Sequence, residues 1–139
     1  MGAASGAPFG DWRWWPNTLK AHCLVLFAEM KGLTSSAAKA AIFEALYEEG
    51  INVSGSRALA DVAANKLGLD HEEVFQYLES GKGAEEVLRT VEAGQRVVQG
   101  GVPFFVVGRA GDESRHPYGF SGAQSVEHFL SVFRKVAEE

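Results

Sequence analysis

The chain has 139 residues, of which 46% are hydrophobic and 22% are charged, a composition typical of one globular domain with a core of its own. Its formal net charge of −5 argues against a nucleic-acid partner, because Lys and Arg supply most of the affinity for phosphates. A membrane span requires about 20 apolar residues, and no stretch of the sequence approaches this length. The first residues do not have the pattern of a signal peptide. We therefore expect a soluble, unprocessed protein with no membrane partner and, by default, a cytoplasmic location.

Residues 1–16 form a first segment that we expect to be irregular. The segment is rich in glycine and alanine and then carries Trp12, Trp14 and Trp15 before Pro16. Such a short segment cannot bury three indole rings by its own folding. We expect these rings to lie on the body of the protein or on a partner.

Five helices are predicted in residues 17–99. The first four are predicted from a polar cap, apolar residues at helical spacing and a terminal glycine, and the fifth from its apolar residues. The first helix, after Asn17 or Thr18, carries apolar residues from Leu19 to Met30 on nearly all sides and should be the buried central helix. The other four should start at Ser35 or Ser36, at Ser54 or Ser56, at Asp70 and near residue 84. The residues expected to face inward are Ala38, Ala41, Ile42, Ala45 and Leu46 in the second helix and Leu59, Val62, Ala63 and Leu67 in the third. In the fourth helix they are Val74, Phe75 and Leu78, and in the fifth Val87, Leu88, Val91 and Val98.

Two strands are predicted next in the chain. The run from Phe104 to Val107 has the aromatic and β-branched content of a strand in the middle of a sheet, buried on both faces. Pro103 precedes it, where the missing N–H of proline is tolerated, and Gly100 and Gly101 allow a sharp entry turn. The second strand should run from Tyr118 to Ser121. Two strands alone do not make a stable sheet, so either helices cover them or further strands belong to it.

A final helix should follow Ser125 as its cap, with Val126, Phe129, Leu130, Phe133 and Val136 facing inward. The turn before it, Gly119 to Ala123, is one residue away from the G-x-S-x-G nucleophile motif. Only Glu127 and His128 follow as partners, both on the same helix, where they cannot supply a separate acid and base. We expect no catalytic residue here. The histidines lack the spacing of metal ligands, so no metal and no cofactor are expected.

Cys23 is the one cysteine, so the 139 residues can form neither an internal disulfide nor a C-x-x-C redox pair. Cysteines are among the most buried residue types, which favours packing in the core. A place in the first turns of a helix, beside His22, instead favours a lowered pKa and a reactive thiol. Both interpretations remain open at this point.

Three stretches occur in a fixed order along the chain: Pro16-Asn17-Thr18-Leu19-Lys20-Ala21-His22, Gly101-Val102-Pro103-Phe104-Phe105-Val106 and Ser121-Gly122-Ala123-Gln124. Together they resemble the DsbA-like thioredoxin-fold oxidoreductases of the FrnE branch, from about residue 7 onwards. The resemblance implies an α/β chain with an incomplete thioredoxin-like fold of the DsbA type. In it, the irregular segment 1–16 is followed by a helical insertion over 17–99 and a strand-strand-helix unit over 100–139.

The resemblance also implies a site. Val102 and Pro103 would form a cis-proline loop facing the redox cysteines of the family. The main chain of Gly101, Val102, Pro103 and Phe104 would pair with an extended peptide or a small thiol substrate. The redox chemistry needs a C-x-x-C at a helix N-terminus, and the family's segment with that motif would precede residue 7.

Three interpretations follow from the absent C-x-x-C. The chain is a truncated thiol–disulfide oxidoreductase that is redox-inactive alone, or a non-catalytic module that binds peptides or thiols through the cis-proline loop. The third relates it to the kappa-class glutathione transferases and isomerases, whose last-strand pattern differs from Ser121-Gly122-Ala123-Gln124. Because a short open sheet and three tryptophans leave apolar surface uncovered, we also expect a homodimer.

Overall fold

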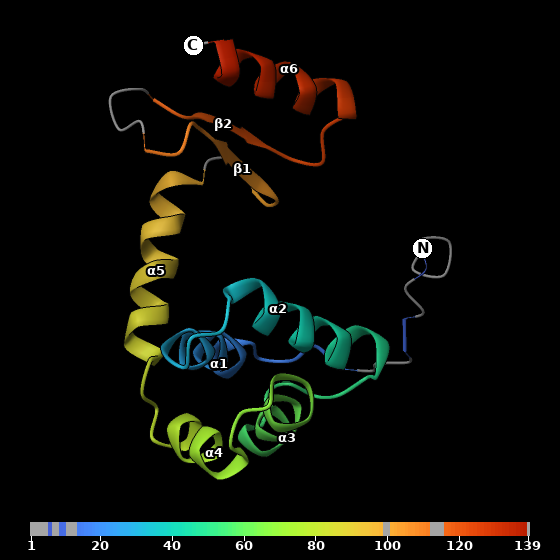
Figure 1. The fold of residues 1–139 in the computed structure, drawn as a ribbon, viewed down its shortest axis with the longest axis vertical. Coiled ribbons are helices and arrows are strands. Elements are labelled where there is room, and N and C mark those ends of the chain that lie inside the picture. The colour runs from blue at the N-terminus through green and yellow to red at the C-terminus, as the bar shows by residue number, and fades with distance from the viewer. Residues whose placement is uncertain (1–5, 7–8, 11–13, 99–100, 112–115, 139) are drawn as a thin grey trace. The chain divides into compact units, whose positions relative to one another are not determined.

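The computed structural model describes residues 6, 9–10, 14–98, 101–111 and 116–138. The chain divides into two compact units, Met1–Arg89 and Thr90–Glu139 (Figure 1). Trp12 and Gly100 lie outside the described residues. Among the helices that are described, none has the length and apolar content to cross a membrane.

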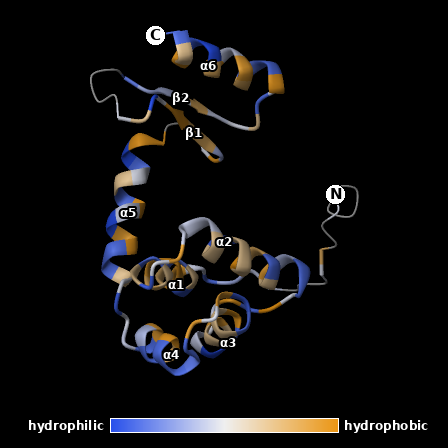
Figure 2. Cartoon of the chain, in the orientation of Figure 1, coloured by the Kyte–Doolittle hydropathy of each residue, from blue (hydrophilic) through white to orange (hydrophobic). Residues whose placement is uncertain are grey.

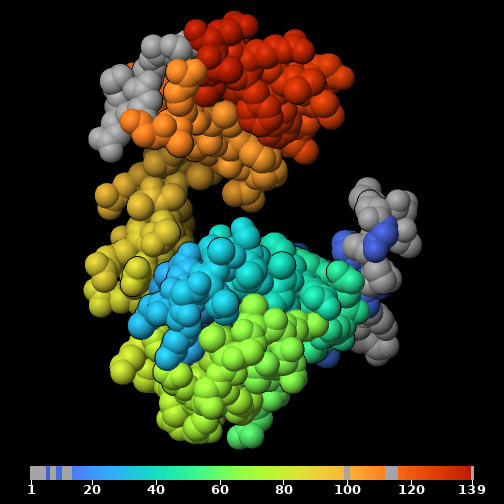
Figure 3. Space-filling view, viewed as in Figure 1, coloured from blue at the N-terminus to red at the C-terminus, as the bar shows by residue number. Residues whose placement is uncertain are grey.

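The first unit is helical. It contains α1 (Leu19–Met30), α2 (Ser35–Phe43), the π-helix η2 (Glu44–Glu48), α3 (Ser56–Leu67), α4 (His71–Glu79) and the start of α5 (Ala84–Val97). Side chains of α2, α3 and α4 meet in one continuous surface of this unit (Figure 3).

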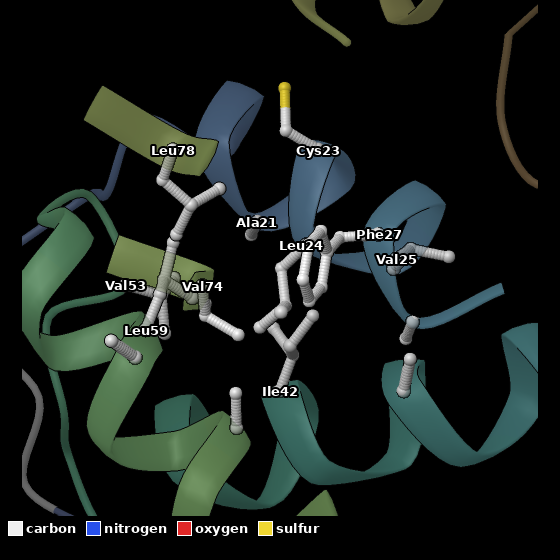
Figure 4. Close-up of a cluster of buried hydrophobic side chains, with 14 of the residues drawn as sticks. Ala21, Cys23, Leu24, Val25, Phe27, Ile42, Val53, Leu59, Val74 and Leu78 are labelled. Carbon is white, nitrogen blue, oxygen red and sulfur yellow. The ribbon is translucent and has the colours of Figure 1, made fainter. Parts of the chain in front are cut away.

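The helix α1 is the centre of the first unit, as predicted. It contacts α2, α3 and α4, and its side chains point to both sides of its axis (Figure 4). Because its residues are apolar on nearly all sides, each contacting helix finds an apolar face to pack against. Its buried residues are Ala21, Cys23, Leu24, Val25, Phe27 and Ala28.

The second helix begins at Ser35 as predicted, whereas the predicted cap of the third helix, Ser54 or Ser56, is wrong. Thr34 caps α2, accepting a 3.2 Å hydrogen bond from the Ala37 N–H, and Gly55 precedes α3. The hydroxyl of Ser54 instead accepts from the Asn17 N–H at 2.8 Å. Asp70 caps α4 as predicted, accepting from the Glu73 N–H at 2.8 Å. Because its hydroxyl makes this tertiary hydrogen bond with Asn17, Ser54 does not cap α3.

The second predicted helix is not α-helical throughout. It begins as α2 and changes to π geometry over Glu44–Glu48. All five of its predicted inward residues are nevertheless buried: Ala38, Ala41, Ile42, Ala45 and Leu46.

The fifth helix buries less than predicted. Val87 joins the core of the first unit, whereas Leu88 and Val91 are exposed. Apolar and polar residues alternate along α5 (Figure 2), but only its first turn packs into that core.

The second unit contains β1 (Phe104–Val107), β2 (Tyr118–Ser121) and α6 (Val126–Glu138). The strands form an antiparallel pair in which Phe105 lies opposite Phe120. The mixed α/β architecture and the bounds of both strands are as predicted. The expectation that β1 is buried on both faces is wrong, because Val106 is 56% exposed and the described sheet has only two strands.

The inward face of α6 differs from the predicted one. Val132 is its buried residue, and Phe129 and Val136 are partly buried. Val126, Leu130 and Phe133 were expected inward but are exposed. The helix packs on the sheet through the 129, 132 and 136 positions, so the neighbouring stripe of the same amphipathic helix faces solvent.

Candidate functional site

The loop that enters β1 is exposed and has an unusual backbone. The Val102–Pro103 peptide bond is cis, and Gly101 has a φ of 100°, in the left-handed region that favours glycine. The Val102 side chain is 85% exposed, while Phe104 is partly buried. Gly101, Val102 and Pro103 thus form one continuous exposed segment leading into the strand, which begins at the partly buried Phe104.

The pairing of the two strands determines which backbone groups of β1 are free. The Gly122 N–H donates to the Pro103 carbonyl at 2.8 Å. Directly opposed residues of an antiparallel pair alternate between hydrogen-bonded and non-hydrogen-bonded. Given the register, Phe105 and Val107 bond to β2, whereas the N–H and C=O groups of Phe104 and Val106 point to the opposite edge.

This opposite edge of β1, with the backbone groups of Phe104 and Val106, is the open edge. Val102 lies just before β1, in the exposed loop that leads into it. Among the described residues, no further backbone group hydrogen-bonds to Phe104 or Val106. An extended chain laid along the open edge can therefore both donate to it and accept from it.

The face of the sheet away from α6 carries Phe104 and Val106. The Phe104 ring lies across Gly119, so that a Cβ on Gly119 would come within 3.2 Å of the ring. A residue with a side chain at position 119 would have to push the ring aside. Gly119 therefore leaves room for the Phe104 ring over β2, on the face of the sheet away from α6.

Aromatic packing on the other face holds the strands to α6. Phe105 stacks on Phe120 at 5.3 Å between ring centroids, and Phe129 meets Phe105 edge-on at 4.9 Å. The His128 ring also packs edge-on against Phe120 at 4.8 Å. Such pairs add to the hydrophobic stabilisation of the unit and fix the position of β1.

The second predicted site residue, Cys23, lies in the first unit. It is 4% exposed and belongs to the main core cluster. Burial raises the pKa of its thiol, and a backbone hydrogen bond and the charge of Lys20 offset this only in part. The environment favours the neutral thiol, which is a poor nucleophile. The loop over 101–104 belongs to the second unit.

One residue of the open edge was not named in the sequence analysis. Val106 has the same outward backbone groups as Phe104, but recognising this requires the register of the strands. The alternation of a β-ladder could have indicated it once Pro103 was taken as a paired acceptor. Within the described parts of the chain, no group of three or more metal-ligating side chains lies together.

The family model described as a DSBA-like thioredoxin domain matches residues 11–134. No protein in a search of curated sequences matches significantly.

Proposed function

Since the chain belongs to the family of DSBA-like thioredoxin domains, we propose that it serves thiol–disulfide chemistry by holding an extended peptide along the open edge of β1. Gly101, Val102, Pro103 and Phe104 form the substrate-binding segment, and Val106 extends it. Peptide pairing of this kind uses main-chain groups, so many sequences are accepted.

The observation that carries the proposal is the direction of the backbone groups of Phe104 and Val106. They point away from β2 and have no other backbone partner in the described chain. An added strand gains hydrogen bonds to both residues. The exposed side chains of Val102 and Val106 offer apolar contacts to alternate side chains of the same peptide.

The 139 residues alone are proposed to be redox-inactive. Exchange of a disulfide requires a thiolate and a resolving cysteine, and the single Cys23 is buried with a raised pKa. The 139 residues contain no C-x-x-C pair, so by themselves they act as a peptide- or thiol-binding module.

A homodimer is also part of the proposal. The open edge and the exposed Val106, Leu130 and Phe133 present unpaired backbone and apolar surface in one unit, which monomers rarely carry. Sedimentation velocity should show a dimer at tens of micromolar protein. A monodisperse monomer under these conditions would rule out self-association.

A pair of proline variants tests the binding proposal. Val106→Pro removes an N–H that points to the open edge, so the hairpin should survive while peptide affinity falls by about tenfold, the effect of one lost hydrogen bond of about 1.4 kcal/mol. Val107→Pro removes an N–H of the β1–β2 ladder and should unfold the hairpin instead. Binding of an extended peptide or of glutathione is followed by the amide signals of Val102 and Phe104.

The proposal is wrong if Val106→Pro keeps the hairpin and binds the peptide as tightly as the parent chain. Redox inactivity is tested separately with insulin reduction and with oxidation of a dithiol peptide. Turnover by the purified 139 residues would contradict it.

A further inference from the structure

A cavity of about 180 Å³ lies inside the first unit, between α1 and the α2–η2 segment. One wall comes from Thr18, the N-cap of α1, and from His22 and Val25 on the helix, which follow it at helical spacing and so share one face. The facing wall comes from α2 and η2. Most of the lining is apolar, including Ile42, Leu46 and Val53.

The volume matches one small apolar group. An apolar cavity of about 150 Å³ holds one benzene ring. A cavity of about 180 Å³ therefore suits a phenyl ring or a branched alkyl chain of similar size. The π geometry of η2, which supplies Leu46 and Tyr47, is a feature that often occurs at functional sites.

Lys39 on α2 is the charged residue of the described cavity lining, and it is exposed. Apart from the phenol of Tyr47, the other titratable group is the exposed His22 on α1, and no carboxylate of the described residues lines the cavity. Lys39 has no ion-pair partner among the described residues, whereas Lys20, Lys31 and Lys66 each pair with a glutamate. In a chain of net charge −5, an unneutralised cation at the mouth of an apolar cavity selects an anionic head group.

We propose that this cavity binds a small monocarboxylate with a compact apolar tail, with the tail among Val25, Ile42 and Leu46 and the carboxylate at Lys39. The site is separate from the open edge and does not depend on the proposed function. A smaller hollow of about 90 Å³ shares Thr18, Leu46 and Tyr47 with it, and Trp15 forms part of the wall of that hollow. The indole N–H signal of Trp15 is therefore a second reporter of binding.

Phenylacetate is the probe for the test, with phenethylamine and benzyl alcohol as cationic and neutral counterparts of similar shape. The full 139-residue chain is titrated with each and followed by amide signals of Val25 and Leu46. Saturable shifts with phenylacetate at concentrations about three- to tenfold below those needed for the other two are expected. Equal response to all three compounds, or none at Val25 and Leu46, overturns the proposal.

Matched variants locate the head group and the tail. Lys39→Gln should weaken phenylacetate binding about three- to tenfold, while Lys82→Gln, an exposed lysine outside the cavity lining, should leave it unchanged. Ala21→Leu fills the cavity and should abolish binding with the melting temperature kept. If Ala21→Leu unfolds the chain, Lys39→Gln and Lys82→Gln still test the proposal. Equal loss of phenylacetate affinity in both variants contradicts it.

Discussion

The Ser56 hydroxyl donates a 2.5 Å hydrogen bond to Glu79 Oε1 and so joins the start of α3 to the end of α4. Lys20 Nζ donates to the same serine at 2.7 Å and to the same carboxylate at 2.9 Å. Ser56 is the buried polar residue of this network. Removing its hydroxyl in Ser56→Ala should lower the free energy of unfolding by about 1 kcal/mol, measured by urea denaturation.

The same network predicts a pH dependence. The Ser56 hydrogen bond, followed by the contacts with Lys20, lowers the pKa of Glu79 below its usual value of 4.5. A carboxyl whose pKa is lower in the folded chain than in the unfolded chain stabilises the fold at pH values above its unfolded-state pKa. This stabilisation is lost as the pH falls through its folded-state pKa. The melting temperature of Glu79→Gln should lie below that of the parent chain at pH 7 and approach it at acid pH.

A difference between the two chains that persists unchanged at acid pH would contradict this account of Glu79. Glu92→Gln is the control, because Glu92 on α5 has no hydrogen bond or ion pair in the described part of the chain. It should show no comparable change with pH.

Gly119 provides a test of how the Phe104 ring packs across β2. Gly119→Val should displace the Phe104 ring, which a Cβ would approach to 3.2 Å, and lower the free energy of unfolding by about 1 kcal/mol. The aromatic proton signals of Phe104 report the displacement. Unchanged Phe104 signals in a folded variant would show that the ring does not lie across Gly119.

Replacing Gly94, unlike Gly119, should stabilise the fold. A Cβ added there meets nothing within 4 Å, and the residue lies inside α5. Gly94→Ala should raise the free energy of unfolding by about 0.5–1 kcal/mol, because alanine loses less backbone entropy in a helix. Thermal and urea denaturation measure the change. A destabilised variant would mean that position 94 is not free in the folded chain.

The thiol of Cys23 should react slowly in the native protein. Its burial limits access to the thiol, and its raised pKa lowers the fraction of thiolate. An aromatic disulfide reagent should therefore modify Cys23 at least about tenfold more slowly in the native protein than in denaturant. Because the folded state holds the proton more tightly, the contribution of Cys23 to stability falls as the pH rises above 9.0, its usual value. Cys23→Ala should lack this alkaline decline. Equal reaction rates with and without denaturant would indicate an accessible thiol.

Local composition was enough to predict α1 and both strands with their bounds. The apolar run of α1 and the aromatic and β-branched content of β1 leave few alternatives. The cap of α3 was predicted wrongly, since the hydroxyls of Ser54 and Ser56 make hydrogen bonds to Asn17 and Glu79, far away in the sequence. The π geometry of η2 had no local signal.

The buried face of each helix or strand was harder to predict from the sequence than its bounds. Val106 and Phe133 have the residue types of a core but are exposed, because the sheet has two strands in the described residues and α6 contacts one of its faces. Leu88 is exposed because only the first turn of α5 packs into the core of the first unit. The site over Gly101 to Phe104 was named from a resemblance. Its extension to Val106 required the register of β1 against β2.

The central claim is that the open edge of β1 receives an extended peptide. Titration of isotope-labelled protein with such a peptide tests it through the four amides of the strand. The account predicts large, saturable shifts and slowed hydrogen exchange at Phe104 and Val106, with smaller changes at Phe105 and Val107, which already bond to β2. No change along the strand, or changes centred on Phe105 and Val107, would contradict it.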